Sequence, residues 1–205
     1  APRPGETAVA RQWTALEPGR TADAVFAFNL AQDAEDMQAA AALFEVPAQN
    51  IVFATADGHI GYQAPGKIPV RQAVPDAEVP SDGTWPRDGS DERYDWQGYV
   101  PSEEMPRVVD PAEGFIVAAN QAVLPDGVAP FLTTDWDYGY RSQRSRQLLE
   151  AEIAAGRTVD VDTMNEVQVD DRSPYAEVLV QPLLEQELAD AFAAERQQLL
   201  ALARE

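Results

Sequence analysis

The sequence has no cysteine, one lysine and one histidine, and these shortages exclude several kinds of chemistry. Without cysteine there is no disulfide, no thiolate nucleophile and no thiolate metal site. A Ser/His/Asp triad would have to use His59, and no Gly-x-Ser-x-Gly nucleophile elbow accompanies it. We interpret His59 as a solvent-exposed turn residue. Zinc-protease, EF-hand, P-loop and dinucleotide-binding patterns are also missing.

Basic residues are scarce, and this scarcity restricts the possible partners. The chain has 15 Lys and Arg against 35 Asp and Glu, a net charge of -20. Such a surface repels phosphate, so it argues against nucleic acid and against anionic membrane as partners. No apolar run approaches the ~18 residues that a membrane-spanning helix needs. The hydrophobic fraction of 45% in 205 residues predicts one large packed domain or two small ones.

The first regular element that the pattern predicts is a helix. Asp33 is placed to cap its first turn. Met37, Ala41 and Phe44 follow at helical spacing and form one apolar face. Pro47 ends the helix.

Three strands complete the predicted core, which we place at about residues 45–63 and 114–120. Ile51–Ala54 and Ile60–Tyr62 read as strands joined through Asp57-Gly58, both of which tolerate positive φ, so a hairpin is predicted. The third strand is expected over Gly114–Ala119.

The rest of the chain divides into an irregular part and a helical part. Residues 64–113 hold eight of the sixteen prolines, which predicts an irregular excursion. The aromatic residues expected to pin it are Trp85, Tyr94, Trp96 and Tyr99. In the helical part, residues 142–205, helices are predicted around Ser142–Ala155 and Pro182–Leu202, the second with Leu184, Leu188 and Phe192 on one face. Helices segregated from antiparallel strands indicate the α+β class.

Three polar residues near the predicted strands are candidates for function. Asn50 precedes the first strand, Arg71 follows the hairpin, and Asn120 ends the third strand. From the residues alone, Asn50 is also explained as a turn asparagine and Arg71 as a member of a surface ion pair.

In chain order, several motifs resemble the penicillin amidase (penicillin acylase) family of N-terminal-nucleophile hydrolases. The resemblance runs from about Trp13 to Leu184. Its motifs are Ala48-Gln49-Asn50-Ile51-Val52-Phe53-Ala54, Asp57-Gly58-His59-Ile60-Gly61-Tyr62, Gly66-Lys67-Ile68-Pro69-Val70-Arg71, Trp96-Gln97-Gly98-Tyr99-Val100-Pro101, Asp110-Pro111-x-x-Gly114-Phe115-Ile116-Val117-Ala118-Ala119-Asn120, Tyr140-Arg141-Ser142-Gln143-Arg144 and Gln168-Val169-Asp170-Asp171-x-Ser173.

The resemblance implies hydrolysis of an N-acyl amide by a serine at the start of the larger of two chains cut from a precursor. The α-amino group of that serine acts as the base. This chain starts at Ala1, and none of its serines stands in the matching context: Ser81, Ser90, Ser102, Ser142, Ser145 and Ser173. We therefore expect an interior segment of the larger (β) subunit, with part of the αββα core and no activity alone.

Two residues carry roles implied by the family. Asn50 matches the asparagine whose amide donates to the oxyanion, and Arg71 matches an arginine that orients the serine or the substrate. Asn120 is treated as structural, since Gln121 follows where the family has a second asparagine. The alternative is a non-catalytic structural or binding module that kept the scaffold.

The family also implies partners, an ion and a location. The expected partners are the smaller (α) subunit, the rest of the β subunit and a small N-acyl substrate of penicillin or N-acyl-homoserine-lactone type. The expected location is the periplasm or the medium. Calcium is expected only in the complete enzyme, with no cofactor assigned in this segment. The aspartate pairs Asp135/Asp137 and Asp170/Asp171 are interpreted as solvated surface rather than as calcium ligands.

Overall fold

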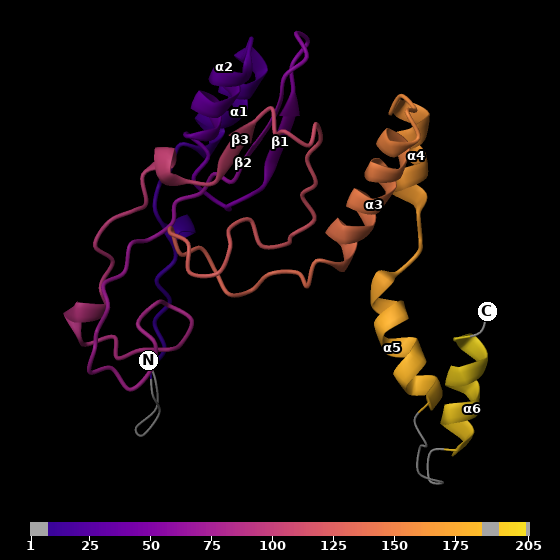
Figure 1. Ribbon diagram of the computed structural model, residues 1–205. Helices are drawn as coiled ribbons and strands as arrows, with labels where there is room; N and C mark the ends of the chain where they lie inside the picture. The colour runs from indigo at the N-terminus through magenta and orange to yellow at the C-terminus, as the bar shows by residue number, and fades with distance from the viewer. Residues whose placement is uncertain (1–7, 186–192, 204–205) are drawn as a thin grey trace. The chain divides into compact units, whose positions relative to one another are not determined.

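The computed structural model of the chain describes residues 8–185 and 193–203 (Figure 1). They form two compact units, one from residues up to Ala118 with Ala122–Trp136, the other from Ala119–Gln121 with the residues from Asp137 on. The helices and strands are α1 (Thr21–Leu30), α2 (Ala34–Ala41), β1 (Ile51–Ala54), β2 (Ile60–Gln63), β3 (Arg107–Val109), α3 (Tyr140–Ala154), α4 (Val161–Val169), α5 (Pro174–Glu185) and α6 (Ala193–Leu202). Within the described ranges, no helix is long and apolar enough to cross a membrane.

The sheet of the first unit has the order β1-β2-β3, and both pairs are antiparallel. The predicted hairpin is confirmed, with Val52 opposite Tyr62 and Phe53 opposite Gly61. The predicted two-residue turn is wrong, since residues 55–59 connect the strands and only Gly58 of the Asp57-Gly58 pair has a positive φ. Gly58 in the turn has φ +98°, a conformation that glycine adopts without steric cost.

The third strand was predicted in the wrong place. β3 is Arg107–Val109, inside the stretch expected to be irregular, and residues 114–120 contain no strand. β1 and β3 pair with the two edges of β2, so residues 114–120 have no position next to β2. After β3 the chain turns at Asp110 (φ 49°) and Gly114 (φ 77°), which carries it out of the sheet.

Gly61 lets the hairpin close over a large side chain. A Cβ at this position would lie 2.1 Å from Cζ of Phe53, its partner across the two strands. The ring of Phe53 occupies the space that a side chain at Gly61 would need, and Phe53 itself is buried. Glycine in a strand interior often marks such a close approach.

The helices of the first unit form beside the hairpin. The predicted cap of α2 is confirmed, because the Asp36 amide donates to Asp33 Oδ1 at 2.9 Å. α2 contacts both β1 and β2, and α1 contacts α2. The α1 helix was not predicted. Its first residue, Thr21, donates to the Val46 carbonyl at 3.0 Å and accepts from the Val46 amide at 3.1 Å, which joins α1 to the loop after α2.

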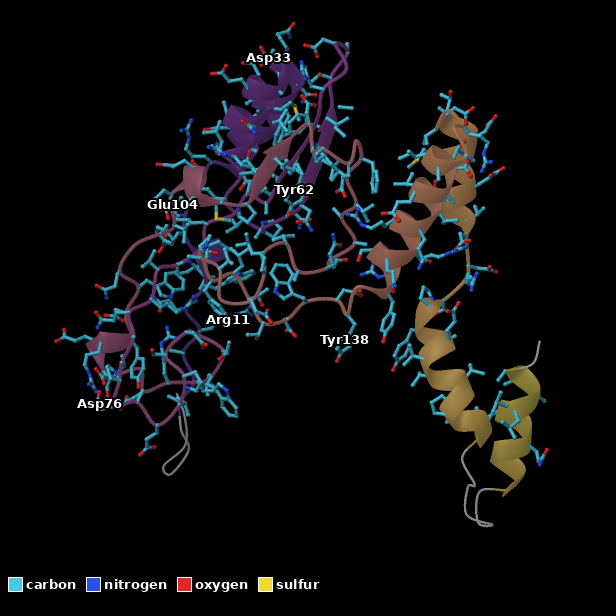
Figure 2. All side chains as sticks on the ribbon, viewed as in Figure 1. Arg11, Asp33, Tyr62, Asp76, Glu104 and Tyr138 are labelled. Carbon is cyan, nitrogen blue, oxygen red and sulfur yellow. The ribbon has the colours of Figure 1, made fainter. Side chains whose placement is uncertain are left out.

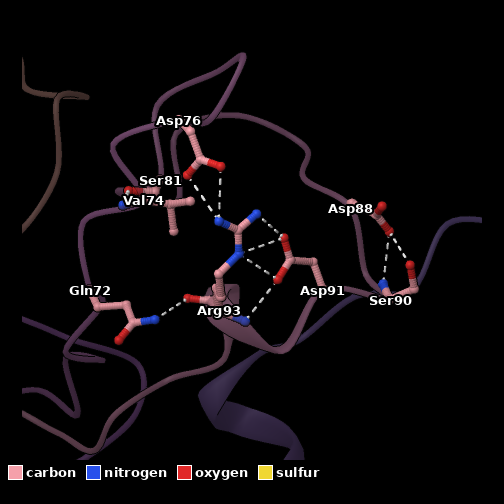
Figure 3. A network of polar contacts seen from close by, with 8 residues as sticks. All are labelled: Gln72, Val74, Asp76, Ser81, Asp88, Ser90, Asp91 and Arg93. Atoms are coloured by element: carbon pink, nitrogen blue, oxygen red, sulfur yellow. Dashed lines mark hydrogen bonds and ion pairs between the residues drawn. The ribbon is translucent and has the colours of Figure 1, made fainter.

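Polar contacts and aromatic packing order the irregular stretch. Arg93 donates to Asp76 and to Asp91, and Gln72 donates to the Arg93 carbonyl at 3.0 Å (Figure 3). These groups are exposed, so each ion pair contributes little by itself, but together they connect three parts of the loop. The Trp96 and Tyr99 rings pack edge-on, 6.1 Å apart. The pinning role predicted for Trp85 is wrong, since Trp85 is 58% exposed.

The second unit is helical, as predicted, but with different boundaries. The helix expected around residues 142–155 is α3, which ends before Gly156 at φ 67°. Pro182, expected to start a helix, lies inside α5, and α4 was not predicted. Leu188 and Phe192 of the expected apolar face lie outside the described residues. Arg144 on α3 binds both carboxylate oxygens of Asp170, at 2.8 and 2.6 Å.

Candidate functional site

Asn50 is placed by the hairpin, one residue before β1. On an antiparallel pair, a residue faces its direct partner and also reaches the diagonal position two residues along. Tyr62 is opposite Val52, so Asn50 is its diagonal neighbour on the same face. The Tyr62 hydroxyl donates to Asn50 Oδ1 at 2.6 Å (Tyr62 is labelled in Figure 2).

In the structure this hydrogen bond uses the Oδ1 end of the Asn50 amide and leaves the Nδ2 end available. Oδ1 is occupied by Tyr62, whereas none of the residues in the described ranges accepts a hydrogen bond from Nδ2. The Asn50 side chain is exposed, so its N–H groups face space that another molecule or chain segment can fill. Tyr62 is 9% exposed, and burial raises the pKa of its phenol to about 12. An ordinary tyrosine already keeps its proton in the neutral range, and burial extends this for Tyr62 to higher pH.

Arg71 lies in the irregular stretch, beneath an aromatic ring and against a glycine. Its Cζ is 5.9 Å from the centre of the Trp96 ring. A Cβ at Gly83 would lie 2.6 Å from Arg71 Nε, so the guanidinium packs where only glycine leaves room. Burial, and then the neighbouring charge of Arg87, lower the pKa of Arg71.

Arg71 forms no ion pair with the residues that the structure describes. Its Nε is buried and has no hydrogen-bond partner among the residues that the structure describes. The guanidinium also lines a cavity of about 290 Å³ with Lys67, Trp13, Trp96 and Ala48. Lys67 is already paired with Glu17, at 3.1 Å. Of the two cations that line this cavity, Arg71 is therefore the one with a hydrogen-bond donor that has no partner among the described residues.

The structure brings Asn50 and Arg71 into the same unit but joins them by no hydrogen bond. Ala48, two residues before Asn50, lines the Arg71 cavity, whereas Asn50 does not. The chain ahead of β1 therefore connects the two candidates.

Asn120 ends no strand, contrary to the prediction. It takes a positive φ of 67°. Its carbonyl accepts from the Asp137 amide at 2.9 Å, and its Oδ1 accepts from Arg141 at 3.0 Å. These bonds tie residues 119–121 to the start of α3.

His59 is the exposed turn residue that the sequence predicts. Its Nδ1 is 2.6 Å from Asp110 Oδ2, and this hydrogen bond raises the pKa of His59. No serine in the described part of the chain hydrogen-bonds to His59, so no Ser/His/Asp arrangement is present there.

The carboxylates considered for calcium do not form an ion site. Asp137 pairs with Arg141 and Asp170 with Arg144, so guanidinium groups occupy these oxygens. The described ranges hold no group of three or more His, Cys, Asp or Glu side chains suited to a metal ion. The residues present here therefore do not fit a calcium site.

Two contributors to the candidate site were not predicted from the sequence. Tyr62 was quoted within a motif but assigned no role, although the Asp57-Gly58 turn sets the register that brings it to Asn50. Gly83 was missed because its contact with Arg71 joins residues twelve positions apart in an irregular loop, for which no sequence signal exists.

Comparison with known proteins gives these residues a family context. The chain matches the family model of penicillin amidase over residues 2–204. It is 31% identical over 168 residues to the acyl-homoserine lactone acylase QuiP of Pseudomonas fluorescens strain Pf0-1, covering 82% of this chain and 19% of that protein. It is 33% identical over 131 residues to the penicillin acylase 2 proenzyme of Pseudomonas sp. strain SE83, covering 63% of this chain and 15% of that protein.

The chain belongs to the penicillin amidase family. Among solved structures it resembles the thermostable penicillin G acylase of Alcaligenes faecalis, with a TM-score of 0.55 and 22% identity over 89% of this chain and 32% of that one. This likeness confirms the α+β class and the partial fold. The chain spans less than a fifth of the length of the curated relatives described above.

Proposed function

We propose that the chain is part of an amidohydrolase that cleaves an acyl group from an N-acyl amide, of penicillin or N-acyl-homoserine-lactone type. The nucleophile in this proposal is an N-terminal serine outside the chain. The observation that carries the proposal is the Asn50 amide, whose oxygen is held by Tyr62 while Nδ2 has no acceptor among the described residues. Family membership supplies the reaction class.

Asn50 acts when the substrate carbonyl becomes tetrahedral. The serine oxygen forms a bond to the carbonyl carbon, and the electron pair of the C=O bond moves to oxygen, which becomes negative. A neutral amide N–H aimed at that oxygen stabilises the charge without changing protonation state. The serine proton passes to the α-amino group and then to the leaving amine.

Arg71 orients the serine or the substrate in this proposal. A guanidinium keeps its charge in a partly buried site and presents donors in a fixed plane. The buried and unpaired Nε supports this role, because such a donor costs free energy unless an acceptor arrives.

The complete enzyme is the polypeptide that contains this chain. We propose that it is made as a precursor, that the segment works with a smaller subunit and the rest of the larger one, and that the enzyme is exported to the periplasm or the medium. Any calcium site would use residues beyond those described.

Replacing Asn50 with alanine in the complete enzyme tests the proposal. Loss of an oxyanion donor should lower kcat by ~10²–10³-fold, with a much smaller change in KM. Asn29→Ala is the matched control, because the amide of Asn29 only donates to the Val25 carbonyl within α1, at 2.8 Å. If Asn50 is only a turn asparagine, its replacement should instead lower stability by on the order of 1 kcal/mol. If kcat stayed within about threefold of the parent, well under the ~10²-fold floor, the oxyanion assignment would be wrong.

A further inference from the structure

An asparagine amide has two ends of nearly equal shape and opposite function. Nδ2 donates hydrogen bonds, whereas Oδ1 accepts them and would repel an oxyanion. A 180° rotation of the amide exchanges the two ends at little steric cost. An asparagine that serves an oxyanion therefore needs a partner that distinguishes them.

We propose that Tyr62 is the positioning residue for the Asn50 amide: its hydroxyl donates to Oδ1 and so directs Nδ2 toward the substrate oxygen. The inference rests on the proposed function of Asn50. It adds a third residue, on the neighbouring strand, to those that the family resemblance implies.

The placement of Tyr62 is well determined by the fold. β2 is the central strand, and Tyr62 pairs with Val52 on one side and with Val108 on the other. Tyr62 is 9% exposed, so its side chain has little free space, although its partner Val52 is 51% exposed. A side chain with few alternative positions can hold its hydroxyl, and through it the Asn50 amide, in one orientation.

The protonation state of Tyr62 suits this task. Burial raises the pKa of its phenol to about 12. A phenolate would be an acceptor only and would attract Nδ2, turning the amide the wrong way. An ordinary phenol, of pKa about 10, is already a donor at the pH values at which a free α-amine, of pKa about 8, serves as a base, and the burial of Tyr62 widens that margin.

The first test is Tyr62→Phe in the complete enzyme, which removes only the hydroxyl. Loss of one neutral hydrogen bond corresponds to about a 2- to 13-fold fall in kcat, and KM should stay within about twofold. Tyr138→Phe is the control, because Tyr138 is 93% exposed, and its kcat should match the parent. An unchanged kcat in Tyr62→Phe would overturn the inference.

The second test is whether Tyr62 acts through Asn50. In an Asn50→Ala background, Tyr62→Phe should cause no further fall in kcat, since no amide is left to position. An equal fall in both backgrounds would show that Tyr62 acts independently of Asn50 and would overturn the inference. The Asn50→Ala variant alone tests the proposed function, so the two failures are distinguishable.

A third measurement stays informative if Tyr62→Phe folds poorly. A fluorinated tyrosine at position 62 keeps the hydroxyl but has a lower phenol pKa. We expect this variant to match the parent at neutral pH and to lose kcat at alkaline pH values where the parent does not. If kcat depended on alkaline pH in the same way in both enzymes, the hydroxyl would not be the positioning group.

Discussion

Replacing Gly61 with alanine tests how closely the two strands of the hairpin pack. A Cβ on Gly61 would lie 2.1 Å from Phe53 Cζ and 2.6 Å from each of the two Cε atoms. Carbon atoms in contact prefer a separation of about 3.5–4.0 Å, so the ring would have to retreat by more than about 1 Å. Phe53 is 8% exposed, so the ring has no free space to enter without moving its neighbours.

We expect Gly61→Ala to lower the free energy of unfolding by about 3 kcal/mol, the upper end of the usual range for overpacking. Urea denaturation of the complete enzyme, followed by tryptophan fluorescence, measures this loss as a lower urea midpoint. Gly89→Ala is the control, because a Cβ there meets no atom within 4 Å, and its urea midpoint should be nearly unchanged.

The cause of the loss is checked by removing the ring. In a Phe53→Leu background, Gly61→Ala should cost little, because the atoms that clash are gone. Equal costs in both backgrounds, or a Gly61→Ala variant as stable as the parent, would refute the packing argument. Because Gly61 adjoins Tyr62, the single variant should also lower kcat, whereas Gly89→Ala should not.

Two further predictions concern pH and the isolated chain. Asp110 raises the pKa of His59, so this pair stabilises the fold below the unfolded histidine value of about 6.5, and the contribution is lost as pH rises through the higher folded value. The pKa of Asp110 is lowered, so the contribution of this pair to stability is also lost in acid. Replacing His59 with glutamine should therefore reduce the fall of the urea midpoint as the pH rises from about 6 to 8. The isolated 205-residue chain should hydrolyse no chromogenic acyl amide and should self-associate, since Val52 and Val108 on the sheet are 51% and 38% exposed; turnover, or a monodisperse monomer by light scattering, would contradict this.

Local chemical signals predicted the elements that depend on neighbours in the sequence. Asp33 caps α2 through the amide three residues later, and Gly58 supplies the positive φ that closes the hairpin. Helix α3 and its end at Gly156 follow from a local pattern in the same way. The α1 helix was missed because the residue before it, Arg20, makes no side-chain cap, and its apolar residues are spread around the helix instead of lying on one face.

Sequence alone determined the family, the hairpin and the choice of Asn50 and Arg71 as candidates, because motifs and turns depend on residues that are close together in the sequence. Tertiary structure decided which segment completes the sheet, since only pairing with β2 makes Arg107–Val109 a strand. It also decided the surroundings of the candidates, placing Gly83 against Arg71 and the Tyr62 hydroxyl on Asn50. These contacts depend on packing and strand register between distant residues, and a pattern read along the chain does not contain the distances that create them.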